Sequence, residues 1–235
     1  MLFRELVLLK SAFVKSYLYR LINKSKSCDW KRVVYINQQE YESVKHLTYL
    51  EYCDYLQRKY GIGLSNYMTK NWNKNYKCTR TKEGLFAHHK FEDHAIMLSS
   101  KEFAMVNPFE WQMAQNIVYC DFLEHLFLHI LICENPAQDK NLFEAVGIGG
   151  IINFIVPELN DFYSGFETKQ EWRKNCYDLV RNDKAVYLIL LKRFKTTCCN
   201  YPLYRKDCLL TSFNEKYNLW NKKKNKALFK EIKKL

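Results

Sequence analysis

The sequence predicts an α+β fold that is mainly helical and forms a single domain. Apolar residues recur every three to four positions over most of the chain, whereas residues 84–90 and 116–120 are short segments typical of strands. No internal repeat and no linker rich in Pro, Gly or Ser divides the 235 residues. We therefore expect one domain over residues 1–235, with an N-terminal helical part at 1–60, a central part at 84–133 and a helical C-terminal part at 134–235.

Two helices are predicted in the N-terminal part. The first is amphipathic, and its apolar face consists of Leu2, Leu6, Leu9, Phe13 and Tyr17. Charged residues interrupt this stretch, so it lacks the uncharged core of a signal peptide or membrane span, and we expect no membrane partner. The second helix covers residues 38–60 and ends at Gly61, a typical C-terminal cap. Residues 61–84 are polar, aromatic and basic with little periodicity, which indicates an irregular segment.

The central part contains two short strands followed by a well-marked helix. Between the strands, an N-cap asparagine, a first-turn proline and a capping-box glutamate predict a short helix over residues 107–114. After the second strand, Asp121 and Glu124 form a capping-box pattern that starts a helix with the sequence DFLEHLFLHILIC. Asn135 and Pro136 end this helix.

The C-terminal part is predicted to be helical throughout. An apolar, glycine-containing stretch predicts a buried helix that ends near Pro157. Thr168 with Glu171 starts a further helix, and another covers residues 184–195. The terminal lysine run, residues 222–234, is typical of a solvated helix face or tail.

The charge and the cysteines restrict the partners and the compartment. Thirty-seven Lys and Arg against 25 Asp and Glu leave a formal charge of +12, which favours polyanionic partners such as DNA or an anionic surface. The nine cysteines are odd in number and include no CxxC pair. We therefore expect buried free thiols and a cytoplasmic protein, because free thiols are stable in a reducing compartment.

Five of the six histidines lie between residues 88 and 129. His88 and His89 are adjacent, so on a strand they point to opposite faces. His125 and His129 are four residues apart on a helix, so their rings lie on one face and can share one ion. This order offers three metal ligands and one free imidazole. Each histidine could instead be an ordinary core residue bonded to a backbone carbonyl.

The segments GLFAHHK, Asn116 in QNIVYC, and His125 and His129 in LEHLFLH resemble the HNH or His-Me finger nucleases. The resemblance covers residues 84–129 and implies a ββα-metal core. It also implies that His89 is the general base that activates water, and we expect its ring to face a groove lined by lysines. The resemblance further implies that His88, His125 and His129 bind the metal. Asn116 would cross-link the loop that positions the base.

The sequence departs from the family pattern in two ways. Twenty-six residues with a predicted helix separate His89 from Asn116, and the zinc-binding CxxC pairs frequent in the family are missing. The sequence alone therefore leaves the roles of His88 and His89 interchangeable.

The resemblance predicts a metal-dependent endonuclease that hydrolyses DNA phosphodiester bonds. We expect Mg or Mn to support activity, while imidazole ligands bind Zn or Ni more strongly. A basic segment before the first strand would contact phosphates, through Lys70, Lys74, Lys77, Arg80 and Lys82. A solvated loop explains these residues equally well. An enzyme that cuts palindromes would form a homodimer, although no interface is evident in the sequence.

Two other hypotheses fit parts of the pattern. In the first, a non-catalytic nucleic-acid-binding protein has a structural zinc site made of Cys120, His125, His129 and His88, closed by four ligands. In the second, a basic helical interaction protein has histidines that are merely buried and spread more than ~10 Å apart, too far to share a zinc at ~2.1 Å from each nitrogen.

Overall fold

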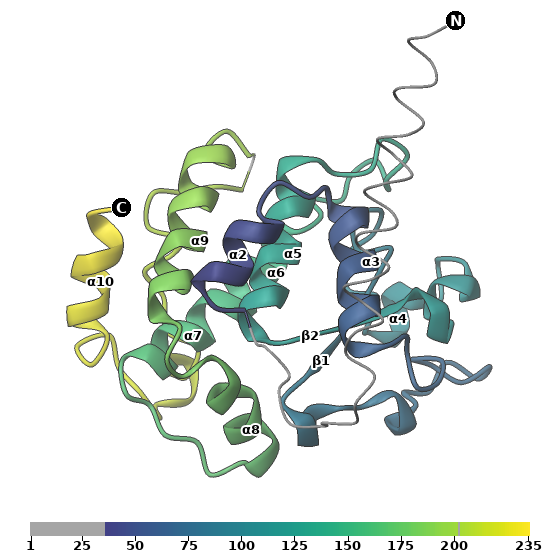
Figure 1. Ribbon diagram of the computed structural model, residues 1–235, viewed down its shortest axis with the longest axis horizontal. Coiled ribbons are helices and arrows are strands. Elements are labelled where there is room, and N and C mark those ends of the chain that lie inside the picture. The colour runs from purple at the N-terminus through teal and green to yellow at the C-terminus, as the bar shows by residue number, and fades with distance from the viewer. Residues whose placement is uncertain (1–35, 202) are drawn as a thin grey trace, which may run out of the picture. The chain divides into compact units, whose positions relative to one another are not determined.

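A computed structural model describes residues 36–201 and 203–235, and helices and a small sheet together make an α+β fold (Figure 1). The helices before the second strand are α2 (Gln38–Val44), α3 (Tyr49–Tyr60) and α4 (Lys101–Ala104). Those after it are α5 (Phe122–Glu134), α6 (Ile148–Gly150), α7 (Val156–Tyr163), α8 (Glu171–Val180), α9 (Lys184–Thr197) and α10 (Lys226–Lys233). The predicted N-terminal helix over residues 2–17 lies outside the described residues.

Strands β1 (Phe86–His89) and β2 (Ile117–Cys120) pair in an antiparallel sheet. In their register His88 lies opposite Val118, and His89 lies opposite Ile117. Directly opposed residues share a face of the sheet, so the two histidines face different neighbours. Val118 belongs to the main core, whereas Ile117 belongs to a second, smaller core.

Helix α5 follows β2 directly and is the central helix of the main core. All of its residues are buried except His125 and Glu134, which are partly exposed. A helix that is apolar on all sides must be surrounded, and α5 packs against α3, α8, α9 and both strands. Figure 1 shows α9 and α3 on either side of it.

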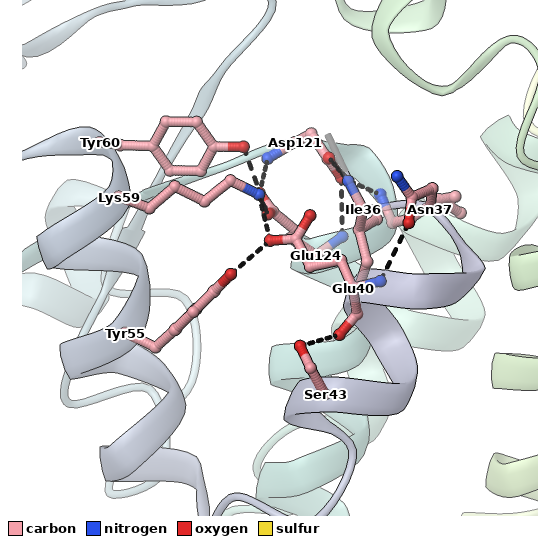
Figure 2. Close-up of polar contacts among 10 residues, drawn as sticks. Ile36, Asn37, Glu40, Ser43, Tyr55, Lys59, Tyr60, Asp121 and Glu124 are labelled. Atoms are coloured by element: carbon pink, nitrogen blue, oxygen red, sulfur yellow. Dashed lines mark hydrogen bonds and ion pairs between the residues drawn. The ribbon is translucent and has the colours of Figure 1, made fainter. Parts of the chain in front are cut away.

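A buried polar network holds the start of α5 (Figure 2). Asp121 accepts two backbone N–H groups of the first turn at 2.8 Å, and Glu124 in return accepts the Asp121 N–H at 2.7 Å. Glu124 also accepts hydrogen bonds from Lys59 at 2.7 Å and from Tyr60 at 3.2 Å. Lys59 additionally pairs with Glu40 of α2. These contacts join α2, α3 and α5, and so fix the direction in which α5 projects its histidines.

The structure corrects three predicted helices. The helix expected over residues 38–60 is two helices, because Thr48 and Glu51 form a capping box that starts α3. The helix expected over residues 107–114 is instead two 3-10 turns, Phe109–Gln112 and Ala114–Asn116. The Asn107 side chain does not cap this segment, since it donates to the Phe103 carbonyl.

The third correction concerns Pro157, which does not end its helix. A π-helical segment, Ile151–Ile155, precedes it, and α7 then continues to Tyr163. Pro157 lies in the first turn of α7, where a missing N–H breaks no α-helical hydrogen bond.

Other predictions are confirmed for the described residues. Gly61 is the C-cap of α3, and α5 starts at its predicted capping box and ends before Asn135. The described cysteines are all free, and only Cys199 is exposed. Within residues 36–201 and 203–235, no helix combines the length and the apolar character needed to cross a bilayer.

Candidate metal centre

The two adjacent histidines of β1 point in different directions, as alternation along a strand predicts. The His88 ring lies 5.3 Å, between ring centroids, from both the His125 and the His129 ring. The His89 ring instead lies 4.4 Å from the Tyr67 ring, on the side of the smaller core. The strand therefore delivers His88, and not His89, to the face of α5.

His88, Glu92, His125 and His129 bring four potential metal donor atoms within 4.8 Å of one another. The His125 and His129 Nε2 atoms are 3.3 Å apart. Glu92 Oε2 lies 3.4 Å from His88 Nδ1 and 3.4 Å from His129 Nε2. Donors around a tetrahedral zinc with bonds of ~2.1 Å are separated by ~3.4 Å. The cluster therefore has the size of a site for one cation.

A hydrogen-bond chain orients the His88 ring. Its Nε2 lies 2.8 Å from the Tyr49 hydroxyl, and this hydroxyl donates to the His89 carbonyl at 3.2 Å. Because the hydroxyl proton is used, Tyr49 can accept a proton donated by His88 Nε2. His88 Nδ1 is buried and has no hydrogen-bond partner, so its lone pair faces the cluster.

A backbone carbonyl orients the His129 ring in the same way. His129 Nδ1 lies 3.0 Å from the Gly147 carbonyl and donates to it, so Nε2 keeps its lone pair for the cluster. Gly147 has a φ of +80°, a conformation that a residue with a Cβ rarely adopts. A Cβ on Gly150 would overlap the His129 ring. Both glycines thus allow α6 to approach His129.

Burial keeps the imidazoles of the cluster neutral. It lowers the pKa of His88 to about 3, and it also lowers the pKa of His125 and of His129. For Glu92, burial works against ionisation, but the surrounding imidazoles outweigh it and hold the pKa well below its ordinary value. At neutral pH the cluster thus has free imidazole lone pairs and a carboxylate, the protonation states that metal ligands require.

The cluster is buried but not closed to solvent. The rings of His88 and His89 are fully buried, whereas the Glu92 side chain is 17% exposed and His125 is partly exposed. Access from solvent is therefore on the side of Glu92 and His125.

His89 lies beside the cluster, on the other side of Glu92. Its Nδ1 is 3.4 Å from Glu92 Oε1, and its Nε2 is 3.1 Å from Gln112 Oε1. Gln112 donates its own amide to the Leu98 carbonyl, so its oxygen accepts the His89 Nε2 proton. We expected His89 to face an open groove lined by lysines, and this is wrong. The ring is enclosed because the 90–115 loop folds over it.

Asn116 lies at the junction of β2 and the same loop. Its side-chain amide donates to the Glu110 carbonyl at 2.7 Å, and its own carbonyl accepts the Lys90 N–H at 2.8 Å. The residue thus joins the loop to the end of β1, immediately after His89.

The basic segment before β1 divides into exposed and engaged side chains. Lys70, Lys74, Lys77 and Lys82 are exposed. Arg80 is only partly exposed; its guanidinium donates to the Tyr60 carbonyl at 2.6 Å, pairs with Glu83 and stacks on Tyr119. Arg80 thus has a structural role that the four lysines lack.

Glu92, Tyr49 and Gly147 belong to the site but were not predicted from the sequence. For Glu92 a local signal existed, since a carboxylate four residues after His88 and three after His89 can return to both rings across a tight turn. Tyr49 and Gly147 reach the site only through tertiary packing, and nothing in their local sequence indicates it.

The geometry also bears on the other hypotheses. Cys120 is not among the clustered donors, and its thiol instead contacts the Phe86 carbonyl. Glu92 takes the place that the zinc-site hypothesis gave to Cys120. The hypothesis of a helical interaction protein requires histidines more than ~10 Å apart, and the histidines of this cluster are closer than that.

No family model, no curated protein and no solved structure matches this chain.

Proposed function

We propose that this protein is a metal-dependent nuclease of the HNH type. One observation carries the proposal: β1, the turn that follows it and α5 bring three imidazoles and a carboxylate to one cation-sized point, with a further imidazole beside it. β1 carries His88 and His89, and α5 carries His125 and His129, with β2 between them in the chain; this order supports the proposed ββα-metal arrangement. His88, His125 and His129 are proposed to bind the cation, and Glu92 joins them.

In the proposed reaction, one water is added across a P–O bond of the nucleic-acid backbone. His89 takes the proton of that water at Nδ1, because Gln112 occupies Nε2. Glu92 Oε1, which lies 3.4 Å from Nδ1, has to turn towards the cation so that the water can reach Nδ1. When bound, the divalent cation neutralises the charge that grows on the phosphate and on the leaving oxygen.

Asn116 is proposed to act through position and not through contact with substrate. It fixes the loop that supplies Gln112, and it holds the backbone at the end of β1. A base must be held within hydrogen-bond reach of its proton, so this cross-link serves the geometry of His89.

The substrate is proposed to be DNA, held in part by the four exposed lysines. Lys74 Nζ lies 5.5 Å from the centre of the Tyr67 ring, and that ring contacts His89. The basic segment is therefore adjacent to the proposed base. Ammonium groups next to the proposed base can hold the phosphates that flank the cleaved bond.

A structural zinc site in a nucleic-acid-binding protein remains the second candidate, and Glu92 is the observation that favours it. Four donors with spacings of 3.3 and 3.4 Å can fill a tetrahedral zinc and leave no position for water. In the nuclease, either Glu92 leaves the cation so that water or substrate can bind, or the cation takes a fifth ligand beside Glu92.

A cleavage assay and a metal analysis, made on the wild type and on Glu92→Gln, separate the two candidates. Purified protein is incubated with supercoiled plasmid and with single-stranded DNA in Mg, Mn, Ni or Zn. The nuclease proposal predicts metal-dependent cleavage by the wild type, abolished by EDTA. His46→Ala is the control, because His46 is exposed and is not among the clustered donors. The zinc-site candidate predicts tight zinc in the purified protein, lost metal and stability in Glu92→Gln, and no cleavage in any metal.

A further inference from the structure

A pocket of about 400 Å³ opens next to the start of β1, the strand that carries His88 and His89, and lies within the ~300–1,000 Å³ range of small-ligand sites. It lies between the 67–81 segment, the start of β1 and helix α8. Aromatic side chains from these three segments line it, namely Tyr67, Tyr76, Phe86 and Trp172. Tyr76 is 77% exposed and Trp172 is 38% exposed, so aromatic surface is available to a ligand.

The pocket is connected to the proposed base through Tyr67 and β1. The Tyr67 ring lines the pocket and also lies 4.4 Å from the His89 ring. Ala87, another lining residue, is two positions before His89 on the strand, a distance of about 6.6 Å.

The charge around the pocket suits a polyanion that carries flat rings. Lys74 and Arg80 are its charged lining residues, and no carboxylate is among the lining residues that the structure describes. Because Arg80 is paired with Glu83, Lys74 is the lining residue that offers its charge to a ligand. Lys70, Lys77 and Lys82 are exposed in the same segment. Aromatic side chains next to lysines are the features with which proteins hold single-stranded nucleic acid, where rings stack on bases and ammonium groups contact phosphates.

We propose that this pocket receives one unstacked nucleobase of the strand that is cut at the metal centre. The inference rests on the proposed nuclease function and narrows its substrate to a single-stranded or locally unpaired strand. A base inside a duplex has both faces covered by its stacked neighbours, so it must leave the stack to lie against Tyr76 or Trp172. The base in the pocket then sets the position of the scissile phosphate relative to His89.

The test measures binding without cleavage. A single strand of about 12 nucleotides carrying one 2-aminopurine, a fluorescent adenine analogue quenched by stacking, is titrated with the full-length protein in EDTA. We expect saturable binding with a changed 2-aminopurine signal, and much weaker binding of the matching duplex. Tyr76→Ala and Trp172→Ala should each bind the single strand about 5- to 150-fold more weakly. Tyr76→Phe keeps the ring and should bind like the wild type.

Tyr217→Ala is the matched control, because Tyr217 is also an exposed tyrosine, at 62%, and does not line the pocket. Equal binding of strand and duplex, wild-type affinity of both alanine variants, or no binding of the strand by the wild type would each overturn the inference. A Tyr76-dependent signal in a protein that never cleaves DNA would support the pocket and reject the nuclease. Cleavage at the wild-type rate by both Tyr76→Ala and Trp172→Ala would support the nuclease and reject the pocket as a base-binding site.

Discussion

Replacing His129 with alanine should remove most of the stabilisation that a bound metal gives the folded protein. At a metal concentration 100-fold above the dissociation constant, binding stabilises the native state by about 2.7 kcal/mol. Since 1 kcal/mol shifts the melting temperature by about 2–4 °C in a chain of this size, the wild type should gain about 5–11 °C. Loss of even an outer-shell partner of a ligand costs 10- to 100-fold in affinity. With a loss of about 100-fold, the variant retains about 0.4 kcal/mol, or a shift of about 1–2 °C.

Scanning calorimetry in zinc and in EDTA measures both shifts. The His129 side chain is 8% exposed, so its truncation also lowers the melting temperature of the metal-free protein. The difference between the two conditions removes this packing effect. His46→Ala should retain the full wild-type difference, because the exposed His46 is not a member of the cluster. A His129→Ala protein with an undiminished metal-dependent shift would refute the assignment of His129 as a ligand.

Three further perturbations test the surroundings of the cluster. Tyr49→Phe removes the partner of His88 Nε2 and should weaken zinc binding about 10- to 100-fold in competition with a chelator. It should also lower the metal-free melting temperature, because the buried His88 Nε2 and His89 carbonyl lose their hydrogen bonds. Unchanged zinc affinity would exclude the orienting role. Gly150→Ala should displace the His129 ring and lower both metal affinity and stability, and a variant equal to the wild type in both would contradict the packing described. Burial raises the pKa of Glu124 to about 8, so the folded state retains a proton that the unfolded chain releases near 4.3. The contribution of Glu124 to the free energy of unfolding in EDTA should therefore fall as the pH rises from about 5 to 8, while the lowered pKa values of the cluster histidines act in the opposite direction up to about 6.5. Urea titrations should show the wild type losing stability relative to Glu124→Gln over this range, and a difference that stays constant with pH would contradict a protonated Glu124.

The parts of the centre that depend on local periodicity could be predicted from the sequence. Alternation along a strand separates His88 from His89, and four-residue spacing puts His125 and His129 on one face of α5. The capping box at Asp121 determines where α5 starts, and therefore which turns carry the two histidines.

The parts that depend on tertiary contact could not be predicted in the same way. Tyr49 reaches His88 from α3, and Gly147 reaches His129 from beyond the end of α5. Burial of His89 depends on a 26-residue loop whose 3-10 turns lack a strong sequence pattern. The interruption between α2 and α3 could have been predicted, because Thr48 and Glu51 have capping-box spacing. The apolar periodicity continues on both sides of it and therefore favoured one long helix.

The most direct test of the central claim compares DNA cleavage and metal content in His89→Ala. His89 lies beside the cluster, and its proposed role is to accept a proton and not to bind the cation. We predict that His89→Ala, folded and loaded with metal like the wild type, cleaves DNA in Mg or Mn at least 100-fold more slowly, since general-base catalysis contributes about 10²–10⁴-fold. His89→Ala protein that binds metal normally and cuts at the wild-type rate would contradict the account.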